Sequence, residues 1–195
     1  LLILKFDGKT AKCSASNMDD FPTAAESFDC SVYFSSAGDF LDAVRRVPFA
    51  NPDKARGILT AVHMYQQGEK LVVAAVEGNI MGETLVTMTS GEKLEGVLNV
   101  PDTSLKAILG ALGKLEDSDL KIEYGPAQAR FTASSVTITT RMLVGKYPNY
   151  RNIMPPSFLN EFTADVKEFQ ALVDQAAISA QKTDYKPSID LDISP

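Results

Sequence analysis

The 195-residue sequence has no tryptophan, a single histidine and only two cysteines. Cys13 and Cys30 do not have the spacing of zinc ligands, and His63 is too isolated to complete a metal site. We therefore interpret the cysteines as reduced thiols of a cytoplasmic protein and predict no metal and no cofactor. The sequence also lacks an apolar run of about 18 residues, so we expect no transmembrane helix and no membrane partner.

Basic residues are outnumbered by acidic ones. The chain has 19 Lys and Arg against 25 Asp and Glu, which gives a net charge of −6. This balance argues against a protein that coats nucleic acid with a basic surface, but it allows positive charge to be kept on one inner face. The length and the 45% hydrophobic content predict one full globular domain with residues left over.

Catalytic motifs are missing as well. The sequence has no glycine-rich phosphate loop, no Gly-x-Ser-x-Gly and no histidine pair on a helix. His63 lies in an apolar, strand-like segment, where a lone histidine is usually structural. We interpret the densest acidic group, Glu116, Asp117 and Asp119, as a solvated turn. No catalytic residue is predicted, and we do not expect an enzyme.

An internal repeat is the strongest positive signal. Residues 36–47 and 165–176 both place an acid before a Phe and then small apolar residues at helical spacing. The apolar stripes are Phe40, Val44 and Val47 in one helix and Phe169, Val173 and Ala176 in the other. Each helix follows a strand-like piece, 30–34 and 158–162. The helices are offset by 129 positions, the distance from Phe40 to Phe169.

A second pair of segments supports this repeat. Asp20-Phe21-Pro22 corresponds to Lys146-Tyr147-Pro148 at an offset of 126 positions, the distance from Pro22 to Pro148. We therefore predict three pieces: residues 1–27 end one domain, 28–155 form a complete middle domain, and 156–195 begin the next. On this interpretation the sequence, which begins at Leu1, is part of a longer protein.

The middle domain is predicted to run strand, helix, several strands, helix, several strands. Residues 58–65 and 70–76 suggest a hairpin around a turn at Gly68. Further strands are expected at 84–89, 96–100, 119–124, 128–133 and 135–143. Pro101-Asp102 opens a helix to about Leu112, with an apolar stripe of Leu105, Ile108, Leu109 and Leu112. Helices and strands do not alternate strictly, so an α+β fold with antiparallel sheets is predicted.

Three stretches carry a family resemblance. Asp19-Asp20-Phe21-Pro22 matches an acidic-Phe-Pro linker, and residues 55–62 match an Arg-x-x-Leu-x-Gly strand opening with Ala61 in place of the Gly. Residues 141–155 are the most specific stretch and are similar to Leu-(Val/Ile)-x-Gly-x-(Phe/Tyr)-Pro-(Asp/Asn)-Tyr followed by a Pro, with a shift of one position before the Gly. Together they resemble the bacterial DNA polymerase III beta subunit, the replicative sliding clamp.

The resemblance implies the DNA clamp fold, in which repeated domains each pack two helices on antiparallel sheets. It also implies a non-catalytic processivity factor. In the full-length protein such subunits self-associate into a ring around double-stranded DNA, with helices lining the hole. A pocket on the ring binds peptides of the DNA polymerase and of clamp loader subunits.

The resemblance also places the peptide pocket. The aligned candidates are Leu59, Val76, Gly78, Asn79, Ile80, Met81 and Pro155. The family usually has Ala-Thr-Asp-Gly-His-Arg-Leu where residues 75–81 read Ala-Val-Glu-Gly-Asn-Ile-Met, so a cation and its donors are lost. Ile80 and Met81 preserve an apolar pocket suited to a hydrophobic anchor. The alternative is that these positions are ordinary core or strand residues.

The inner face of such a ring offers Lys and Arg to DNA phosphates through weak, salt-sensitive contacts. The candidates are Arg45 and Arg46 on the first helix, Lys106 and Lys114 on or after the second, and Lys54 and Arg56 before a strand. The alternative is that they are solvated surface charges.

Two other functions remain open. One is a diverged clamp-fold module that binds proteins without clamping DNA, which the altered 75–81 run favours. The other is an unrecognised enzyme, which would need a pocket with convergent polar groups.

Overall fold

The structure is a computed structural model that describes residues 2–14, 27–47, 57–77, 80–89, 93–158, 160–179, 189 and 191–192. The chain divides into two compact units, Leu1–Tyr150 and Arg151–Pro195. Within the part of the chain that the structure describes, no helix is long and apolar enough to cross a bilayer.

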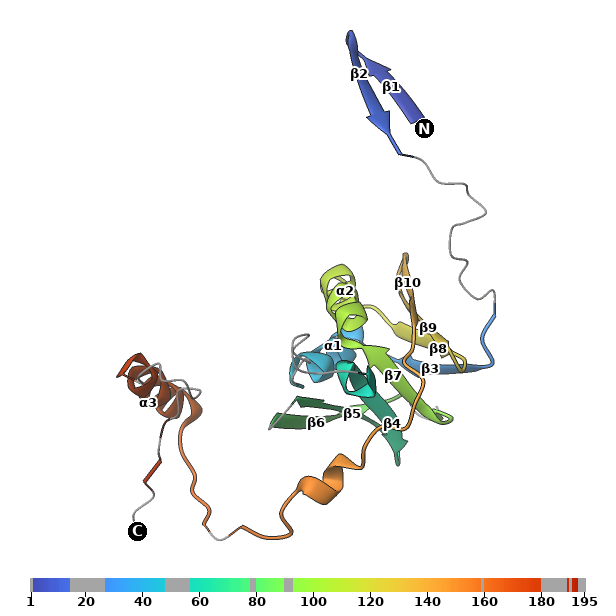
Figure 1. The fold of residues 1–195 in the computed structure, drawn as a ribbon. Coiled ribbons are helices and arrows are strands. Elements are labelled where there is room, and N and C mark those ends of the chain that lie inside the picture. The colour runs from blue at the N-terminus through green and yellow to red at the C-terminus, as the bar shows by residue number, and fades with distance from the viewer. Residues whose placement is uncertain are drawn as a thin grey trace. The chain divides into compact units, whose positions relative to one another are not determined.

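The first unit opens with a two-stranded antiparallel hairpin. Strand β1 (Leu2–Phe6) pairs with β2 (Lys9–Cys13) from Leu2↔Cys13 to Phe6↔Lys9 (Figure 1). Asp7 and Gly8 form the turn with φ of 47° and 71°. Two successive positive φ angles match the right-handed twist of the strands, and Asp-Gly is a preferred pair for this geometry. The Asp20-Phe21-Pro22 motif lies outside the described residues.

In the described residues, the rest of the first unit contains two four-stranded antiparallel sheets and two α-helices. One sheet has the order β10-β9-β8-β3 and the other β6-β5-β4-β7. The strands are β3 (Cys30–Phe34), β4 (Ala61–Gln67), β5 (Lys70–Glu77), β6 (Ile80–Thr87), β7 (Val97–Pro101), β8 (Leu120–Tyr124), β9 (Gln128–Ala133) and β10 (Val136–Arg141), and the helices are α1 (Ala37–Arg45) and α2 (Asp102–Leu112). This arrangement confirms the predicted α+β class and its antiparallel sheets.

The topology is a pattern of strand, helix and three strands that occurs twice. Each sheet takes three consecutive strands from one half and the first strand from the other half. Accordingly β3 pairs with β8 from Cys30↔Tyr124 to Phe34↔Leu120, and β7 pairs with β4 from Val97↔Tyr65 to Pro101↔Ala61. The two halves are therefore interlocked, since separating them would break both sheets.

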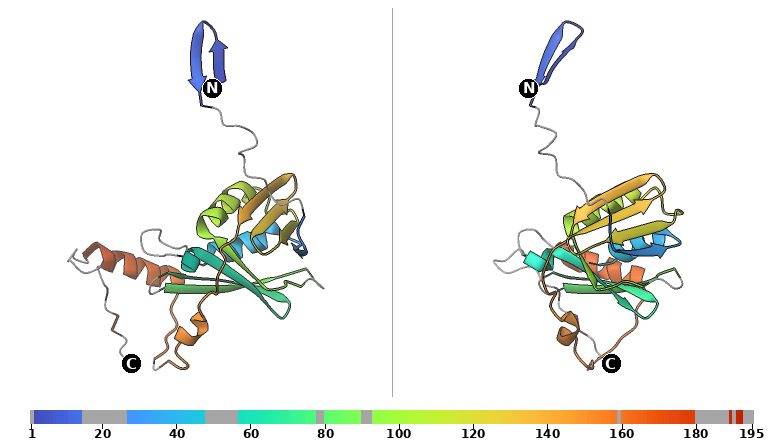
Figure 2. Two further views of the ribbon diagram at one scale, coloured as in Figure 1. Left: turned by 45° about the vertical axis from the view of Figure 1, so that its right-hand side comes forward. Right: turned by 90° about the vertical axis from the view of Figure 1, so that its right-hand side faces the viewer.

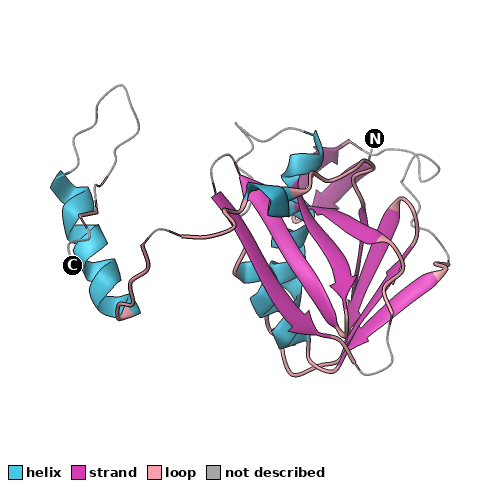
Figure 3. Ribbon diagram, turned by 90° about the horizontal axis from the view of Figure 1, so that it is seen from below, coloured by secondary structure: helices cyan, strands magenta, loops and turns pink. Residues whose placement is uncertain are grey.

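The two helices lie over the two lines, here called seams, along which an edge strand of one sheet meets an edge strand of the other. Helix α1 lies against β6 and β3, and α2 lies against β10 and β7, so each helix contacts an edge strand of both sheets. Figure 2 shows these helices alongside the sheets, and in Figure 3 they lie behind the strands. The Thr89 N–H donates to the Tyr33 carbonyl at 2.9 Å across one seam, and the Leu143 N–H donates to the Asn99 carbonyl at 2.8 Å across the other.

One apolar core fills the space between these helices and sheets. The helix stripes Phe40, Val44 and Val47, and Leu105, Ile108 and Leu112, are buried as predicted, whereas Leu109 is only partly buried. Phe40 packs between Phe34 and Phe131, with ring centroids 5.5 Å and 6.0 Å apart. Burial of such large side chains is the main stabilising contribution to a domain of this size.

Several strand limits differ from the sequence prediction. Residues Gly57–Thr60 form a short 3-10 turn rather than the start of a strand, because the Thr60 hydroxyl donates to the Gly57 carbonyl at 2.8 Å and closes the turn. Strand β6 begins at Ile80 rather than at residue 84, because β5 extends to Glu77 and offers a partner down to the pair Glu77↔Ile80. The remaining strands differ by at most two residues at either end.

The second unit contains α3 (Val166–Ser179), the helix predicted from the repeat. Asp165 caps it, because its carboxylate accepts from the backbone N–H groups of Lys167 at 2.9 Å and Glu168 at 3.1 Å. The predicted stripe of Phe169, Val173 and Ala176 is half-buried. The expected strand at 158–162 is wrong for the described residues 158 and 160–162, since no described segment pairs with them.

Candidate functional site

A second apolar cluster lies on the face of the β6-β5-β4-β7 sheet that points away from the helices. Side chains alternate along a strand, so Val62 and Met64 enter the main core while His63 and Tyr65 point to the opposite face. There Ala74, Tyr147 and Tyr150 are buried in this second cluster. Ile58, Leu59, Tyr65, Val76 and Met81 pack around them. We call this set of eight residues the outer-face cluster.

The outer-face cluster contains three of the predicted pocket residues. Leu59, Val76 and Met81 come together there, and Val76 faces Met81 directly in the β5–β6 register. Ile80 does not join them, because adjacent strand residues point to opposite faces, and its side chain is 62% exposed. Gly78 and Asn79 lie outside the described residues, and the exposed Pro155 belongs to the second unit.

Tyr147 and Tyr150 form the centre of this cluster and were not predicted as site residues. They lie on the segment after β10, which is attached to the sheet through Asn99. The Asn99 carbonyl accepts from the Leu143 N–H, and the Asn99 side-chain Nδ2 donates to the Gly145 carbonyl at 3.4 Å. The sequence did contain a signal for these two residues, because both lie in Tyr147-Pro148-Asn149-Tyr150, part of the most specific family stretch.

His63 supports this segment from the sheet. Its ring stacks on Tyr147, with centroids 4.5 Å apart and an angle of 6° between the planes. Its Nδ1 lies 2.7 Å from the Asn99 Oδ1, so the histidine donates and the amide oxygen accepts. Burial lowers the pKa of His63, and the bond to Asn99 opposes this shift. The ring is therefore mainly neutral at pH 7, and its contacts with Tyr147 and Asn99 join β4 to the segment after β10 and to β7.

The tyrosine hydroxyls differ in their hydrogen bonding. The Tyr150 hydroxyl donates to Glu83 Oε2 at 2.5 Å and lies 3.1 Å from the Tyr65 hydroxyl. Burial raises the pKa of Tyr150, and its bonds to Glu83 and Tyr65 raise it further. The Tyr147 hydroxyl is buried and completes no hydrogen bond to the rest of the described chain. Burial raises the pKa of Tyr147, and the backbone N–H of Val76 opposes this rise through a contact that falls short of a well-formed hydrogen bond.

Four of the predicted DNA-facing cations, Arg45, Arg46, Lys106 and Lys114, lie on or directly after the two helices. Arg46 and Lys114 are exposed, and Lys106 is paired with Asp102 at 3.2 Å between Nζ and Oδ2. Lys54 and Arg56 lie outside the described residues. Over residues 36–47 and 102–119 the sequence has six acidic and four basic residues, so this helical layer carries a net charge of −2.

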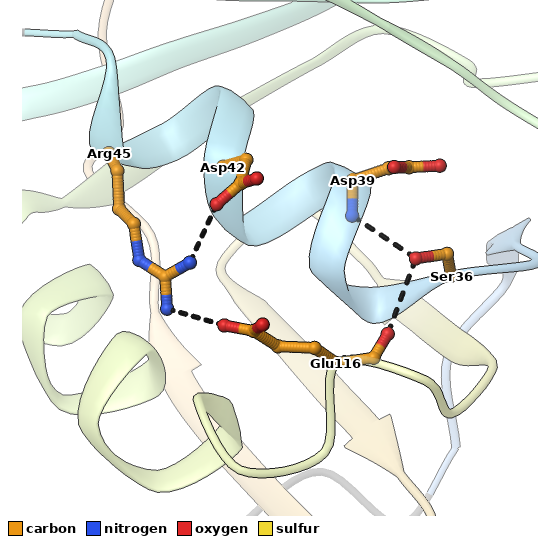
Figure 4. A network of polar contacts seen from close by, with 5 residues as sticks. All are labelled: Ser36, Asp39, Asp42, Arg45 and Glu116. Atoms are coloured by element: carbon orange, nitrogen blue, oxygen red, sulfur yellow. Dashed lines mark hydrogen bonds and ion pairs between the residues drawn. The ribbon is translucent and has the colours of Figure 1, made fainter.

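Arg45 is already engaged by two carboxylates. One terminal nitrogen of its guanidinium lies 2.7 Å from Asp42 Oδ1 and the other lies 3.0 Å from Glu116 Oε1 (Figure 4). The bond to Asp42, followed by that to Glu116, raises the pKa of Arg45. The acidic group after α2 is exposed, as predicted for a solvated turn, but Glu116 also bridges this turn to α1.

Comparison with known proteins places this fold. The family model of the DNA polymerase III beta subunit, central domain, matches residues 36–149. The beta sliding clamp of Synechococcus elongatus is 25% identical over 160 residues, covering 80% of this chain and 43% of the relative. That of Synechocystis sp. is 22% identical over 179 residues, covering 84% of this chain and 45% of the relative. The chain thus spans less than half the length of these curated relatives.

Solved clamp structures share the architecture. The DNA polymerase sliding clamp of Bacillus subtilis superimposes with a TM-score of 0.78 at 20% identity, covering 92% of this chain and 47% of that one. A sliding clamp from Bartonella birtlesii, solved bound to griselimycin, gives 0.74 at 20% identity, covering 90% of this chain and 48% of that one. The fold is the DNA clamp fold. The chain belongs to the DNA polymerase III beta subunit family and contains its central domain.

Proposed function

We propose that the chain is part of a sliding clamp subunit, a non-catalytic processivity factor that acts in the cytoplasm. In the full-length protein the subunits would close a ring around duplex DNA and tether the replicative polymerase. The observation that carries this proposal is the central clamp domain, recognised over residues 36–149 and folded as two interlocked halves with one helix each. A ring that encloses DNA holds it by topology and needs no sequence-specific contacts.

The proposal extends to the order of domains. Residues 1–27 would end one clamp domain, 28–155 would be the middle domain, and 156–195 would begin the third. Helix α3 supports this order, because its Phe169 lies 129 positions after Phe40 of α1 and both helices carry the same apolar spacing. A ring needs matching surfaces on every subunit, so we expect closure only in the complete protein.

We propose that the layer of α1 and α2 faces the DNA. Arg46, Lys106 and Lys114, together with Lys54 and Arg56, would contact phosphates through weak bonds that allow sliding. Arg46 and Lys114 are exposed, and Lys106 is half-exposed with its ammonium held near Asp102. The net negative charge of the layer keeps this attraction small, which suits a ring that must move along its substrate.

We propose that the outer-face cluster forms the floor of the pocket for polymerase and clamp loader peptides. Leu59, Val76 and Met81 offer apolar surface beside Tyr147 and Tyr150. Interfaces of this kind take most of their affinity from one apolar anchor in a pre-formed pocket. The proposal does not rest on Gly78, Asn79, Ile80 or Pro155, which the family resemblance also named.

The deciding experiment is retention on DNA. The full-length protein is loaded by its clamp loader on nicked circular DNA, and the circle is then cut. Stable retention on circles and release from linear ends would establish a topological clamp. Loss at equal rates from circles and from linear DNA would overturn it.

A second candidate is a clamp-fold module that binds proteins but does not encircle DNA. The excess of acidic residues in the helical layer favours it, because that layer would repel phosphates. A full-length protein that folds, self-associates and binds polymerase peptides, but cannot be loaded on circles, would support this candidate over the clamp.

A further inference from the structure

Arg45 is held between two structural elements that are distant in sequence. Asp42 lies one turn earlier on α1, whereas Glu116 lies in the turn after α2, 71 positions from Arg45 (Figure 4). The three side chains are about half-exposed, at 40% for Arg45, 58% for Asp42 and 48% for Glu116. The guanidinium therefore lies at the surface, and each of its two terminal nitrogens already contacts a carboxylate.

The position of Glu116 is fixed by its backbone. Its carbonyl accepts from the Gly38 N–H at 2.9 Å and from the Ser36 hydroxyl at 3.2 Å, and the Ser36 oxygen in turn caps α1 by accepting from the Asp39 N–H at 3.2 Å. The turn lies so close to α1 that a Cβ on Gly38 would meet the Glu116 Cβ and carbonyl at 3.2 Å. These main-chain contacts hold the Glu116 carboxylate beside Arg45.

We propose that Asp42 and Glu116 act as internal competitors of DNA phosphate for Arg45. This inference rests on the proposed function, in which α1 faces the DNA. A guanidinium binds carboxylates and phosphates with the same donors, so a phosphate that approaches either terminal nitrogen of Arg45 competes with a carboxylate already bound there. The site of Asp42, Arg45 and Glu116 carries a net charge of −1, and it repels DNA despite its arginine.

The neighbouring groups reinforce this effect. Arg46 lines a shallow hollow between α1 and β6 together with Asp39 and Asp42. If the C-cap residue Arg46 is counted with α1, two charged groups are acidic and two are basic, so they add no net charge. Glu116 therefore makes the face of α1 negative, and Asp117 and Asp119 in the same exposed turn add to the repulsion.

The test compares three charge-neutralising variants in the full-length protein. Glu116→Gln and Asp42→Asn each remove one competing carboxylate, whereas Asp117→Asn is the matched control. Asp117 lies in the same turn and is exposed, but it does not take part in the Arg45 contacts. Affinity for a fluorescent DNA duplex is measured by anisotropy as salt is raised from about 50 to about 200 mM.

We expect Glu116→Gln and Asp42→Asn to bind DNA about three- to tenfold more tightly at the lowest salt, with a slope of log affinity against log salt steeper by up to about 0.9 for one added phosphate contact. Asp117→Asn should change affinity less than about twofold. Adding Arg45→Ala to Glu116→Gln should abolish the gain, because the released guanidinium is its source.

Each result separates the two proposals. Equal gains from Asp117→Asn and Glu116→Gln, or a gain that survives Arg45→Ala, would overturn the inference, since only overall charge would then matter. Wild-type binding that is unchanged by Glu116→Gln would overturn it too, while leaving the clamp intact. No DNA binding by any variant, with the folded ring confirmed by light scattering, would instead contradict the DNA-facing role on which the inference depends.

Discussion

The ring of His63 lies parallel to the ring of Tyr147, with their centroids 4.5 Å apart. His63 comes from β4 inside a sheet, whereas Tyr147 lies on the segment after β10. The stack therefore joins two parts of the chain that are 84 positions apart. It gives the lone histidine a structural role that can be measured through its protonation.

Stability should fall on acidification because of His63. Burial lowers its pKa in the folded protein below the ordinary 6.5, so the unfolded chain binds the proton more tightly. The stabilising contribution of the neutral ring is complete above pH 6.5 and is lost as the pH falls from 6.5 through the folded pKa. Urea unfolding between about pH 8 and about pH 5 should show this loss.

The variant His63→Gln provides the comparison for this pH dependence. It has no imidazole, and His63 is the single histidine of the chain, so its stability should vary less over the same range. Equal pH dependence in both proteins would show that other groups, such as carboxylates, cause the effect.

Replacing Asn99 should destabilise the folded protein. It is 5% exposed and binds His63 through its side chain, Gly145 through its amide and Leu143 through its carbonyl. Asn99→Ala leaves the His63 and Gly145 groups without their partner, which should lower the free energy of unfolding by about 1–3 kcal/mol. Asn149→Ala, an exposed position on the same segment, should change it by less than about 0.5 kcal/mol. Chemical denaturation measures both.

Two tyrosine-to-phenylalanine substitutions should have different effects. Both Tyr147 and Tyr150 are buried, at 7% and 4% exposure, so each change deletes one buried hydroxyl. Tyr150→Phe removes the bond to Glu83 and should destabilise the protein by about 1–2 kcal/mol. Tyr147→Phe removes a hydroxyl that completes no hydrogen bond in the described structure and should be neutral or stabilising. Similar losses in both thermal melts would contradict this assignment.

The proposed pocket predicts different effects for two adjacent residues. Met81 belongs to the outer-face cluster, whereas Ile80 points to the other face of β6 and is largely exposed. In the full-length protein Met81→Ala should weaken binding of a labelled polymerase-derived peptide by about tenfold, in line with the loss of a pocket-lining side chain. Ile80→Ala should stay within about twofold. If Ile80→Ala were the more damaging change, the pocket would lie on the other face.

Local patterns were sufficient for most of the fold. Helical spacing located α1, α2 and α3, because each stripe of apolar residues is buried or half-buried against its own unit. Strand patterns were less reliable at the ends of β4 and β6. There the limits depend on a turn hydrogen bond at Thr60 and on how far β5 extends as a partner, and neither is encoded in periodicity.

The site was harder to predict, because its contacts join residues that are far apart in sequence. Leu59, Val76 and Met81 were placed by resemblance, and the structure brings them together. Asn99 lies between Leu98 and Val100, so its sequence surroundings indicate an ordinary strand residue. Its hydrogen bonds to Leu143 and Gly145 are visible only in the structure. Arg45 was interpreted as a phosphate contact because nothing nearby in the sequence indicates the ion pair with Glu116.

The exchange of first strands between the two halves also constrains how this domain can be built. Strand β3 completes the sheet of the second half, and β7 completes the sheet of the first. Neither half holds a full sheet by itself, so folding requires pairing over long stretches of chain and should be correspondingly slow. A chain cut between β6 and β7 would yield two pieces that are unfolded alone but able to assemble with each other. Such a cut would turn a single domain into a heterodimer whose stability depends on concentration.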